Sequence, residues 1–165
     1  MVSVKELEQF FFRAMRQGWA FGGKAEPVPG LPGYKDFWHR EPDRGLVLLD
    51  RYCVARNGCN TKTCGTTTIW HNDVPVWTMH YGGQCEDVAI PCLRAALQDA
   101  YEAELFFGGR GTDGFMYEKL AYENCDRDGC STLGTFENFE GEEHIYVSGG
   151  EEFGLLWYKG GTLLA

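Results

Sequence analysis

The sequence predicts one α+β domain over residues 1–165, with a strongly curved antiparallel β-sheet and two helices packed on one of its faces. Three observations support this fold class. Apolar residues recur at helical spacing near the N-terminus and again after residue 90. The C-terminal third alternates between short apolar runs and turn residues, which is typical of a β-meander. Hydrophobic residues make up 44% of the 165-residue chain and aromatic residues 15%, which is enough for a core.

Helix-start signals mark both expected helices. Ser3 and Glu6 form a capping-box pattern in front of an apolar stripe, so a helix is expected from about residue 4 to 17. Pro91 suits the first turn of a second helix, from about residue 90 to 105. A stretch with three prolines follows the first helix, and we expect it to be irregular, as a flap or a connector.

The middle of the chain predicts strands and a central hairpin. Strands are expected at residues 36–40 and 45–54, followed by a turn-rich link over residues 55–66 and a loop over residues 82–87. A β-hairpin is expected at residues 69–82, because the Asn-Asp pair at its centre tolerates the positive φ of a tight turn.

The second arm of this hairpin alternates. Trp77 and Tyr81 fall on one face, and His80 falls on the other. We expect the Trp77 face to pack against the helices and the His80 face to be open.

The expected meander spans residues 115–160. Its four strands are expected at residues 115–123, 131–138, 143–147 and 153–159. The turns between them are expected at residues 126–129, 140–141 and 148–150.

Charge and composition exclude several classes of partner. The formal net charge is −9, so we expect no direct nucleic-acid binding, which needs clustered Lys and Arg. The N-terminus is too charged for a signal peptide, and no apolar run approaches the roughly 18 residues of a membrane span. We therefore expect a cytoplasmic protein without a membrane partner, whose seven cysteines are thiols.

Metal binding and cysteine catalysis are not expected. Cys59 and Cys64 form one pair and Cys125 and Cys130 another, but the gaps are wide for a structural zinc site. A Cys59–Cys64 disulfide would need an oxidising compartment. Cys85 lies near a histidine in sequence, which is weak evidence for a dyad because a dyad is recognised by geometry. We expect no cofactor.

Asp50 is the most unusual polar residue. It shares a strand face with Leu46, Leu48 and Tyr52. Two interpretations remain open. Asp50 could lie at the sheet rim, hydrogen-bonded to backbone or water, or it could be a polar anchor in an aromatic pocket.

The favoured hypothesis is a module that binds or senses a small molecule or peptide on a sheet face. Its candidate ligand-binding residues are Asp36, Trp38, Asp50, Tyr52 and His80. One alternative is a small hydrolase or isomerase that uses Asp36, Asp50 and His80. The other is a protein–protein interaction domain without a pocket, of which a homodimer would be one form. No catalytic residue is assigned.

Seven short motifs follow one another along the chain. They are Trp19-Ala20-Phe21-Gly22-Gly23, Asp36-Phe37-Trp38, Asp50-Arg51-Tyr52, the segment 75–83, Arg110-Gly111, the segment 139–145, and Tyr158-Lys159-Gly160-Gly161. In this order they resemble the bacterial family catalogued as domain of unknown function 5680. The resemblance covers nearly the whole chain, and the segment 75–83 is its most specific part.

The resemblance implies no activity, because none is established for the family. Members look like stand-alone cytosolic proteins or like C-terminal partners of helix-turn-helix DNA-binding domains, which would suit a ligand-sensing module. The chain departs from the family pattern at residues 53–55 and 65–67, and His80 stands where the family has Asn. This substitution makes the His80 face one to inspect for function.

Overall fold

The computed structural model describes residues 2–106, 110–112, 114–125, 134–147 and 149–164. Within these residues the chain forms two helices, α1 (Val4–Met15) and α2 (Ile90–Ala103), and nine strands. The strands are β1 (Glu26–Pro27), β2 (Tyr34–Glu41), β3 (Leu46–Asn57), β4 (Asn60–His71), β5 (Val74–Glu86), β6 (Gly114–Tyr117), β7 (Leu120–Cys125), β8 (Asn138–Val147) and β9 (Glu152–Thr162).

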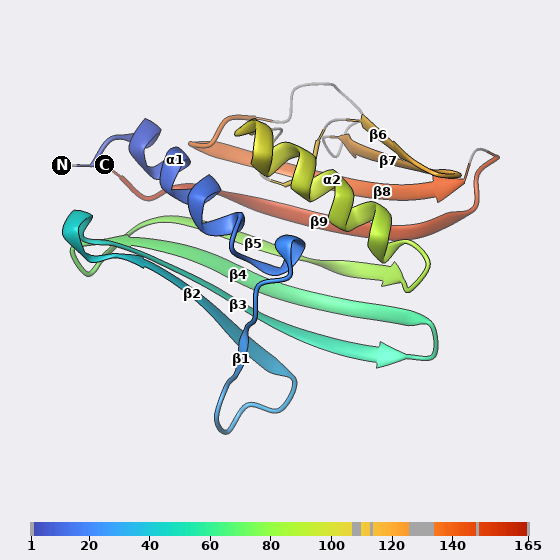
Figure 1. Ribbon diagram of the computed structural model, residues 1–165, viewed down its shortest axis with the longest axis horizontal. Helices are drawn as coiled ribbons and strands as arrows, with labels where there is room; N and C mark the ends of the chain where they lie inside the picture. Colours follow the sequence, from blue (N-terminus) through green and yellow to red (C-terminus); the bar gives the residue numbers. More distant parts are fainter. Residues whose placement is uncertain (1, 107–109, 113, 126–133, 148, 165) are drawn as a thin grey trace.

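All the strands belong to one antiparallel sheet, in the order β1-β2-β3-β4-β5-β9-β8-β7-β6. Figure 1 shows both helices over the same face of this sheet. The α+β class and the antiparallel sheet were predicted correctly. The predicted strong curvature is wrong, because the sheet is open and is not strongly curled. Strong curvature needs bulges inside the strands, and the two register irregularities among the described pairings lie near strand ends, at Ile69/Trp70 and Ile145/Tyr146.

Both helices begin where their start signals predict. Ser3 Oγ accepts from the backbone N–H of Glu6 at 3.3 Å, and the backbone N–H of Ser3 donates to Glu6 Oε2 at 3.1 Å, which completes the capping box. Pro91 lies in the first turn of α2. Each helix ends two residues earlier than expected. The helix α2 stops at Glu104, whose left-handed backbone (φ 54°) cannot continue a helix.

The central hairpin is confirmed, and its neighbours are longer than predicted. Asn72 and Asp73 have φ values of 50° and 64° at the β4–β5 turn. The turn-rich link is in fact paired strand, since β3 and β4 form one hairpin with Gly58 at its tip. The loop expected at residues 82–87 is also largely strand. There β5 continues to Glu86 because it pairs with both β4 and β9.

The irregular stretch after α1 contains a 3-10 turn, η1 (Trp19–Phe21), and β1, which pairs with β2. A second 3-10 turn, η2 (Pro42–Arg44), occupies the expected turn between β2 and β3. The three-proline stretch is therefore in part a connector that adds an edge strand to the sheet.

The C-terminal region differs from the predicted meander in its strand ends. The strand expected at residues 115–123 is a β6–β7 hairpin that turns at Glu118, where φ is 55°. Of the strand expected at residues 131–138, residues 131–133 lie outside the described residues, and residues 134–137 precede β8 and are not a strand. The expected turn at residues 126–129 also lies outside the described residues. The turn expected at Gly141 lies inside β8. Glycine is needed there because a Cβ would clash with the ring of Tyr158 on β9.

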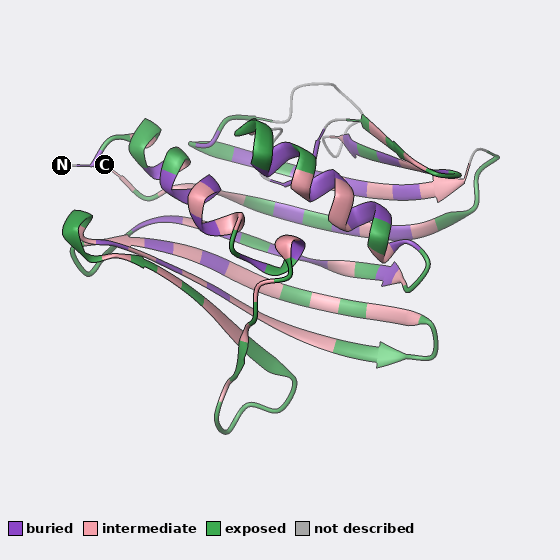
Figure 2. Ribbon diagram, viewed as in Figure 1, coloured by how far each residue is buried: buried purple, intermediate pink, exposed green. Residues whose placement is uncertain are grey.

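The core lies between the sheet and the helices. Trp77 is fully buried, stacks on Phe136 at 4.8 Å between ring centroids, and contacts Phe11 of α1 at 5.2 Å. Figure 2 shows buried residues along the sheet side of both helices and at alternate positions of the central strands. Tyr81 is also buried, whereas His80 is exposed. The predicted orientation of the two faces of β5 is therefore correct.

Candidate functional site

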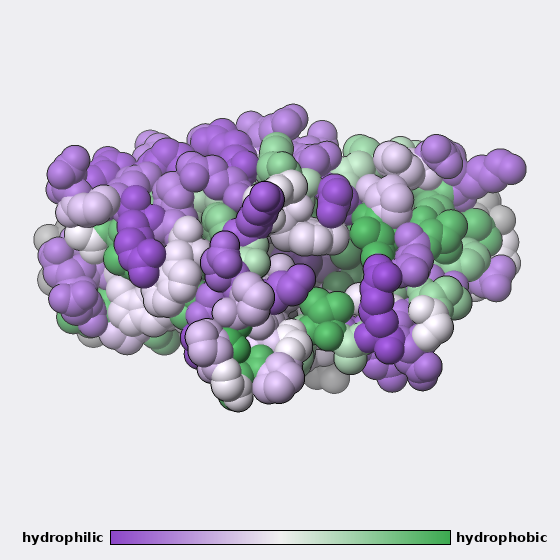
Figure 3. Space-filling model, turned by 60° about the horizontal axis from the view of Figure 1, so that its bottom comes forward, coloured by the Kyte–Doolittle hydropathy of each residue, from purple (hydrophilic) through white to green (hydrophobic). Residues whose placement is uncertain are grey.

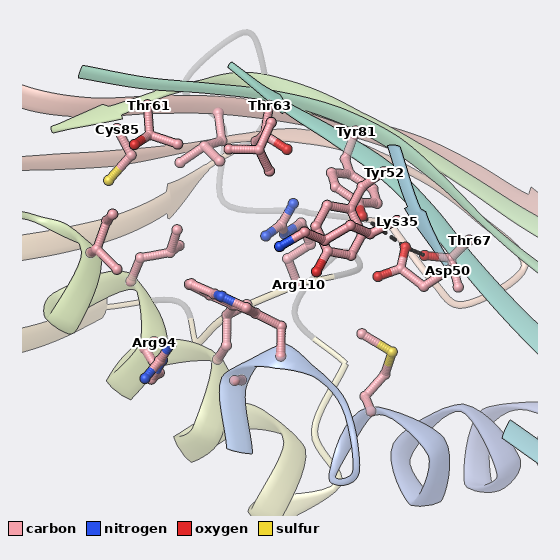
Figure 4. Close-up of a pocket in the computed structure, with 18 of the residues that line it drawn as sticks. Lys35, Asp50, Tyr52, Thr61, Thr63, Thr67, Tyr81, Cys85, Arg94 and Arg110 are labelled. Carbon is pink, nitrogen blue, oxygen red and sulfur yellow. Dashed lines mark hydrogen bonds between the residues drawn. The ribbon is translucent and has the colours of Figure 1, made fainter. Parts of the chain in front are cut away.

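A cavity of about 480 Å³ lies between the sheet and the helical layer. Its sheet wall is formed by alternate residues of β3, β4 and β5, and its other wall by α2, η1 and the end of α1. Figure 3 shows a hollow near the middle of the face that it draws, and Figure 4 shows the side chains that line the cavity. Its volume falls in the range of about 300–1,000 Å³ that is usual for small-molecule sites.

The period-two alternation of three neighbouring strands builds the sheet wall. On β3 it turns Asp50, Tyr52 and Val54 into the cavity. On β4, Thr67 lies directly opposite Asp50, and Gly65 lies between Tyr52 and Tyr81. A Cβ at Gly65 would lie 2.6 Å from the Tyr81 hydroxyl, so glycine lets this side chain of β5 pass across β4.

Asp50 is the acidic group of this wall. It is 8% exposed, and its Oδ1 accepts two hydrogen bonds, from Tyr81 Oη at 2.7 Å and from Thr67 Oγ1 at 3.0 Å. No described residue donates to Oδ2, and Figure 4 shows this second oxygen directed into the cavity. The interpretation of Asp50 as a rim residue bonded to backbone or water is therefore wrong. Its surroundings are those of a polar group in an aromatic pocket.

Burial raises the pKa of the Asp50 carboxyl, although hydrogen bonds from Tyr81 and Thr67 and the charge of Arg110 lower it by smaller amounts. Burial, together with the nearby Asp50 carboxylate, raises the pKa of Tyr81 well above that of a free phenol. Tyr81 therefore keeps its proton and remains a hydrogen-bond donor. The pKa of Tyr52 is raised by the same two causes.

Arg110 is the buried cation of the cavity. It is 9% exposed, and its Nε lies 3.0 Å from Oε2 of Glu143, which is fully buried. Tyr122 Oη donates to the other oxygen of Glu143 at 2.7 Å. The guanidinium carbon of Arg110 lies 4.8 Å from the centroid of the Tyr81 ring, a cation–π contact. Arg110 thus links the Asp50–Tyr81 pair to the Glu143–Tyr122 pair.

The described residues satisfy the guanidinium of Arg110 only in part. Its Nη1 is buried, and no described residue accepts a hydrogen bond from it. Burial by itself would lower the pKa of Arg110, but the carboxylate of Glu143 and neighbouring tyrosines raise it, so the guanidinium stays charged. A buried charged donor without a partner is costly in a folded protein. A ligand acceptor is one way to satisfy it.

The five sequence-predicted site residues do not share one face. Asp50 and Tyr52 line the cavity, whereas Asp36, Trp38 and His80 lie on the opposite face of the sheet, because their positions in the strands have the other parity. One pocket therefore cannot contain all five. The acid–base set Asp36, Asp50 and His80 is likewise divided by the sheet.

On the outer face each of these three residues has a local partner. Asp36 accepts two hydrogen bonds of 2.7 Å from Arg51. Trp38 lies under the guanidinium of Arg40, 4.3 Å from the ring centroid. His80 Nδ1 lies 3.1 Å from the hydroxyl of Thr66.

Sequence reasoning did not name Arg110 or Lys35 as site residues. Arg110 stood only in a short Arg-Gly motif after α2, and its carboxylate partner is on β8, so no local pattern joined them. Lys35 lies opposite Tyr52 across the β2–β3 register, and this pairing between strands is not specified by any local pattern.

The cysteines are arranged differently from their sequence spacing. Cys64 lies opposite Cys53 across β3 and β4, and not next to Cys59, with 3.2 Å between the Sγ atoms of Cys53 and Cys64. Cys85 lines the cavity, and burial raises the pKa of its thiol to about 12. The partner expected for Cys125 lies outside the described residues. Among those described, no three His, Cys, Asp or Glu side chains gather as a metal site would require.

Comparisons with known proteins give one match. The family model for a domain of unknown function, DUF5680, matches residues 58–163. Comparison with curated proteins gave no match, and comparison with solved structures gave none. In the part of the chain that the structure describes, no helix is long and apolar enough to cross a membrane.

The matched range begins at the β3–β4 turn. It is therefore shorter than the resemblance drawn from the motifs, which covers nearly the whole chain. It includes Thr67, Tyr81, Arg110 and Glu143, and it leaves Asp50 outside. Because the model matches more than half of the chain, this protein belongs to the family of domain of unknown function DUF5680.

Proposed function

We propose that this protein binds a small organic molecule in the cavity between β3–β5 and α2. The observation that carries the proposal is the pair of incompletely satisfied charged groups in one enclosed space. Asp50 presents an oxygen to a cavity of about 480 Å³, and Arg110, which lines the same cavity, has a buried nitrogen for which no described residue is an acceptor. Buried polar groups are normally paired, so these two favour a ligand that pairs with them.

The rest of the lining suits the body of such a molecule. Met79, Leu93 and Leu97 supply apolar surface, and Tyr101 supplies a buried aromatic ring. A largely apolar wall with a few convergent polar groups is the usual composition of a small-molecule site.

The test uses N-phenyl-1-naphthylamine, a neutral dye whose fluorescence rises in apolar surroundings. We expect saturable binding of one dye per chain. Thr63→Trp places an indole in the cavity and should weaken binding by at least about tenfold, because it fills the space of the dye. Thr66→Trp is the matched control, since Thr66 lies on the same strand but pairs with His80 on the outer face.

A second cavity-filling variant, Leu97→Trp, approaches from the helical wall. Circular dichroism and thermal unfolding identify any variant that fails to fold. Absence of saturable binding to the wild type, or unchanged binding by both folded cavity-filling variants, would overturn the proposal.

A further inference from the structure

We propose that the ligand is a small organic acid whose anionic group binds between Arg110 and Lys35. This inference rests on the proposed function, because it names the chemical class that the same cavity takes. The distribution of charge is the first support. Four cationic side chains and one carboxylate line the cavity, although the whole chain has a net charge of −9. They are Lys35, Arg56, Arg94, Arg110 and Asp50.

Two of the four cations already have partners at the edge of the cavity. Arg56 lies 3.4 Å from Asp87, and both side chains are well exposed. Arg94 lies over the ring of Trp19, with 4.8 Å between the guanidinium carbon and the ring centroid. Arg94 also has a buried Nε for which no described residue is an acceptor, but Figure 4 shows its guanidinium apart from the ends of Lys35 and Arg110. Lys35 and Arg110 are therefore the two cations that can hold one anion between them.

Arg110 and Lys35 are complementary as an anion site. Glu143 occupies the Nε edge of Arg110, and the buried Nη1 is left for another acceptor. Lys35 lies opposite Tyr52 in the β2–β3 register and makes no ion pair with any described residue. Figure 4 shows the ends of Lys35 and Arg110 both directed into the cavity. A planar anion can therefore accept from the inner guanidinium and from the outer ammonium together.

Asp50 restricts the chemical class of the ligand further. Its hydrogen-bonded oxygen is turned to Tyr81 and Thr67, and its second oxygen is an acceptor within the cavity. An anion would be repelled there, so the part of the ligand near Asp50 should carry a donor such as a hydroxyl, an amide N–H or an amine. The structure thus favours an organic acid with a hydrogen-bond donor away from its acidic group.

The experiment compares two dyes with the same rings. N-phenyl-1-naphthylamine is neutral, and 1-anilinonaphthalene-8-sulfonate carries one added sulfonate. We expect the anionic dye to bind the wild type at least about tenfold more tightly, since a charge-assisted hydrogen bond to a buried cation exceeds a neutral contact by about this factor. The preference should fall as salt concentration rises, because Lys35 is exposed.

Lys35→Gln should weaken the anionic dye several-fold and leave the neutral dye unchanged. Lys62→Gln is the matched control, because Lys62 is an exposed lysine on β4 that does not line the cavity. For the inner cation, the pair Arg110→Gln with Glu143→Gln removes both buried charges together, so that neither is left unpaired. This double variant should also lose the preference for the anionic dye.

The two proposals fail in different ways. If neither dye binds, the cavity does not bind small molecules and the proposed function is wrong. If the neutral dye binds as tightly as the anionic one, or if Lys35→Gln weakens both dyes equally, the acidic ligand class is wrong and the cavity proposal stands.

A separate observation on the outer face carries a second inference. We infer that Cys53 and Cys64 form a reversible cross-strand disulfide. They lie directly opposite each other on β3 and β4, and their Sγ atoms are 3.2 Å apart. Opposed residues of antiparallel strands have Cα separations of about 4.5–5.5 Å, which lies within the range of disulfides. Cys64 is exposed, so a small disulfide can reach it.

The oxidant in this step is a low-molecular-weight disulfide such as oxidised glutathione. The Cys64 thiolate attacks one sulfur of that disulfide, forming a mixed disulfide and releasing one reduced thiol. The Cys53 thiolate then attacks the Cys64 sulfur, which closes the protein disulfide and releases the second thiol. The protein loses two electrons and two protons, and the small disulfide gains them.

Intact-mass measurement after incubation with oxidised glutathione tests this inference. We expect the wild type to lose the mass of two hydrogens, with peptide mapping placing the bond at Cys53–Cys64. Cys53→Ser should instead retain a glutathione adduct on Cys64, while Cys59→Ser should close the bond as the wild type does. A lasting adduct on wild-type Cys64, or no reaction there, would overturn the inference.

Discussion

The hydroxyl of Tyr81 donates a 2.7 Å hydrogen bond to Oδ1 of Asp50, although the two residues lie on strands β5 and β3 with β4 between them. The contact exists because Gly65 on β4 has no side chain under the Tyr81 ring. It places a buried phenol against a buried carboxylate at the wall of the cavity. Four predictions concern this arrangement and the ion pair beside it.

Removing the Tyr81 hydroxyl should destabilise the protein. Tyr81→Phe leaves Oδ1 of Asp50 with Thr67 as its remaining donor, and loss of a hydrogen bond to a buried charged group costs about 1.5–3 kcal/mol. Urea unfolding measures the change in the free energy of unfolding. Tyr52→Phe is the control, because no described residue hydrogen-bonds to the Tyr52 hydroxyl, and it should cost under about 0.5 kcal/mol. Equal losses in both variants would contradict this prediction.

The stability of the protein should depend on pH through Asp50. Burial raises the pKa of this carboxyl in the folded chain. The folded chain therefore binds this proton more tightly than the unfolded chain does. The stability that the proton contributes is lost as pH rises through the folded pKa. Asp50→Asn has no such titration. The stability of this variant relative to the wild type should therefore be greater at about pH 7.5 than at about pH 4. A difference that is the same at both pH values would show that the carboxyl titrates normally.

Breaking the Arg110–Glu143 pair should be among the most damaging changes in the chain. Arg110→Met or Glu143→Leu leaves the other charge buried without its partner, which costs about 3–5 kcal/mol. The double variant Arg110→Met with Glu143→Leu removes both charges and should recover much of that loss. A double-mutant cycle by chemical denaturation measures the coupling. Additive losses would show that the two charges do not stabilise each other.

Replacement of Gly65 by alanine should destabilise the protein. In Gly65→Ala the Cβ would lie 2.6 Å from the Tyr81 ring and 2.8 Å from the carbonyl oxygen of Arg51, so the tyrosine or the backbone must shift, at a cost of about 1–3 kcal/mol. Gly114→Ala is a control, because no described residue has an atom within 4 Å of the added Cβ. Thermal unfolding compares the two variants, and dye binding shows whether the cavity wall has moved. A Gly65→Ala protein as stable as the Gly114→Ala protein would refute this packing argument.

Part of the site could be predicted from strand parity. Alternation places Asp50 on the face of Leu48 and Tyr52, and Tyr81 on the face of Trp77, as the structure has them. The same parity rule assigns Asp36 to the outer face once its register with Arg51 is known. That register is a pairing between strands, and no local pattern specifies it. The predicted five-residue site therefore combined residues from two faces.

The sequence by itself determined the features that depend on neighbouring residues. The capping box of Ser3 and Glu6, the Asn72-Asp73 turn and the alternation of β5 all depend on short-range geometry. Tertiary structure decided which strands are neighbours. Pairing with β9 makes β5 longer than the expected hairpin arm and makes Gly141 part of β8. The fold also brings Arg110 and Glu143 together as an ion pair. The physical reason is range: turns and caps are satisfied within a few residues, whereas a buried charge or a strand edge is satisfied by whatever the fold brings to it.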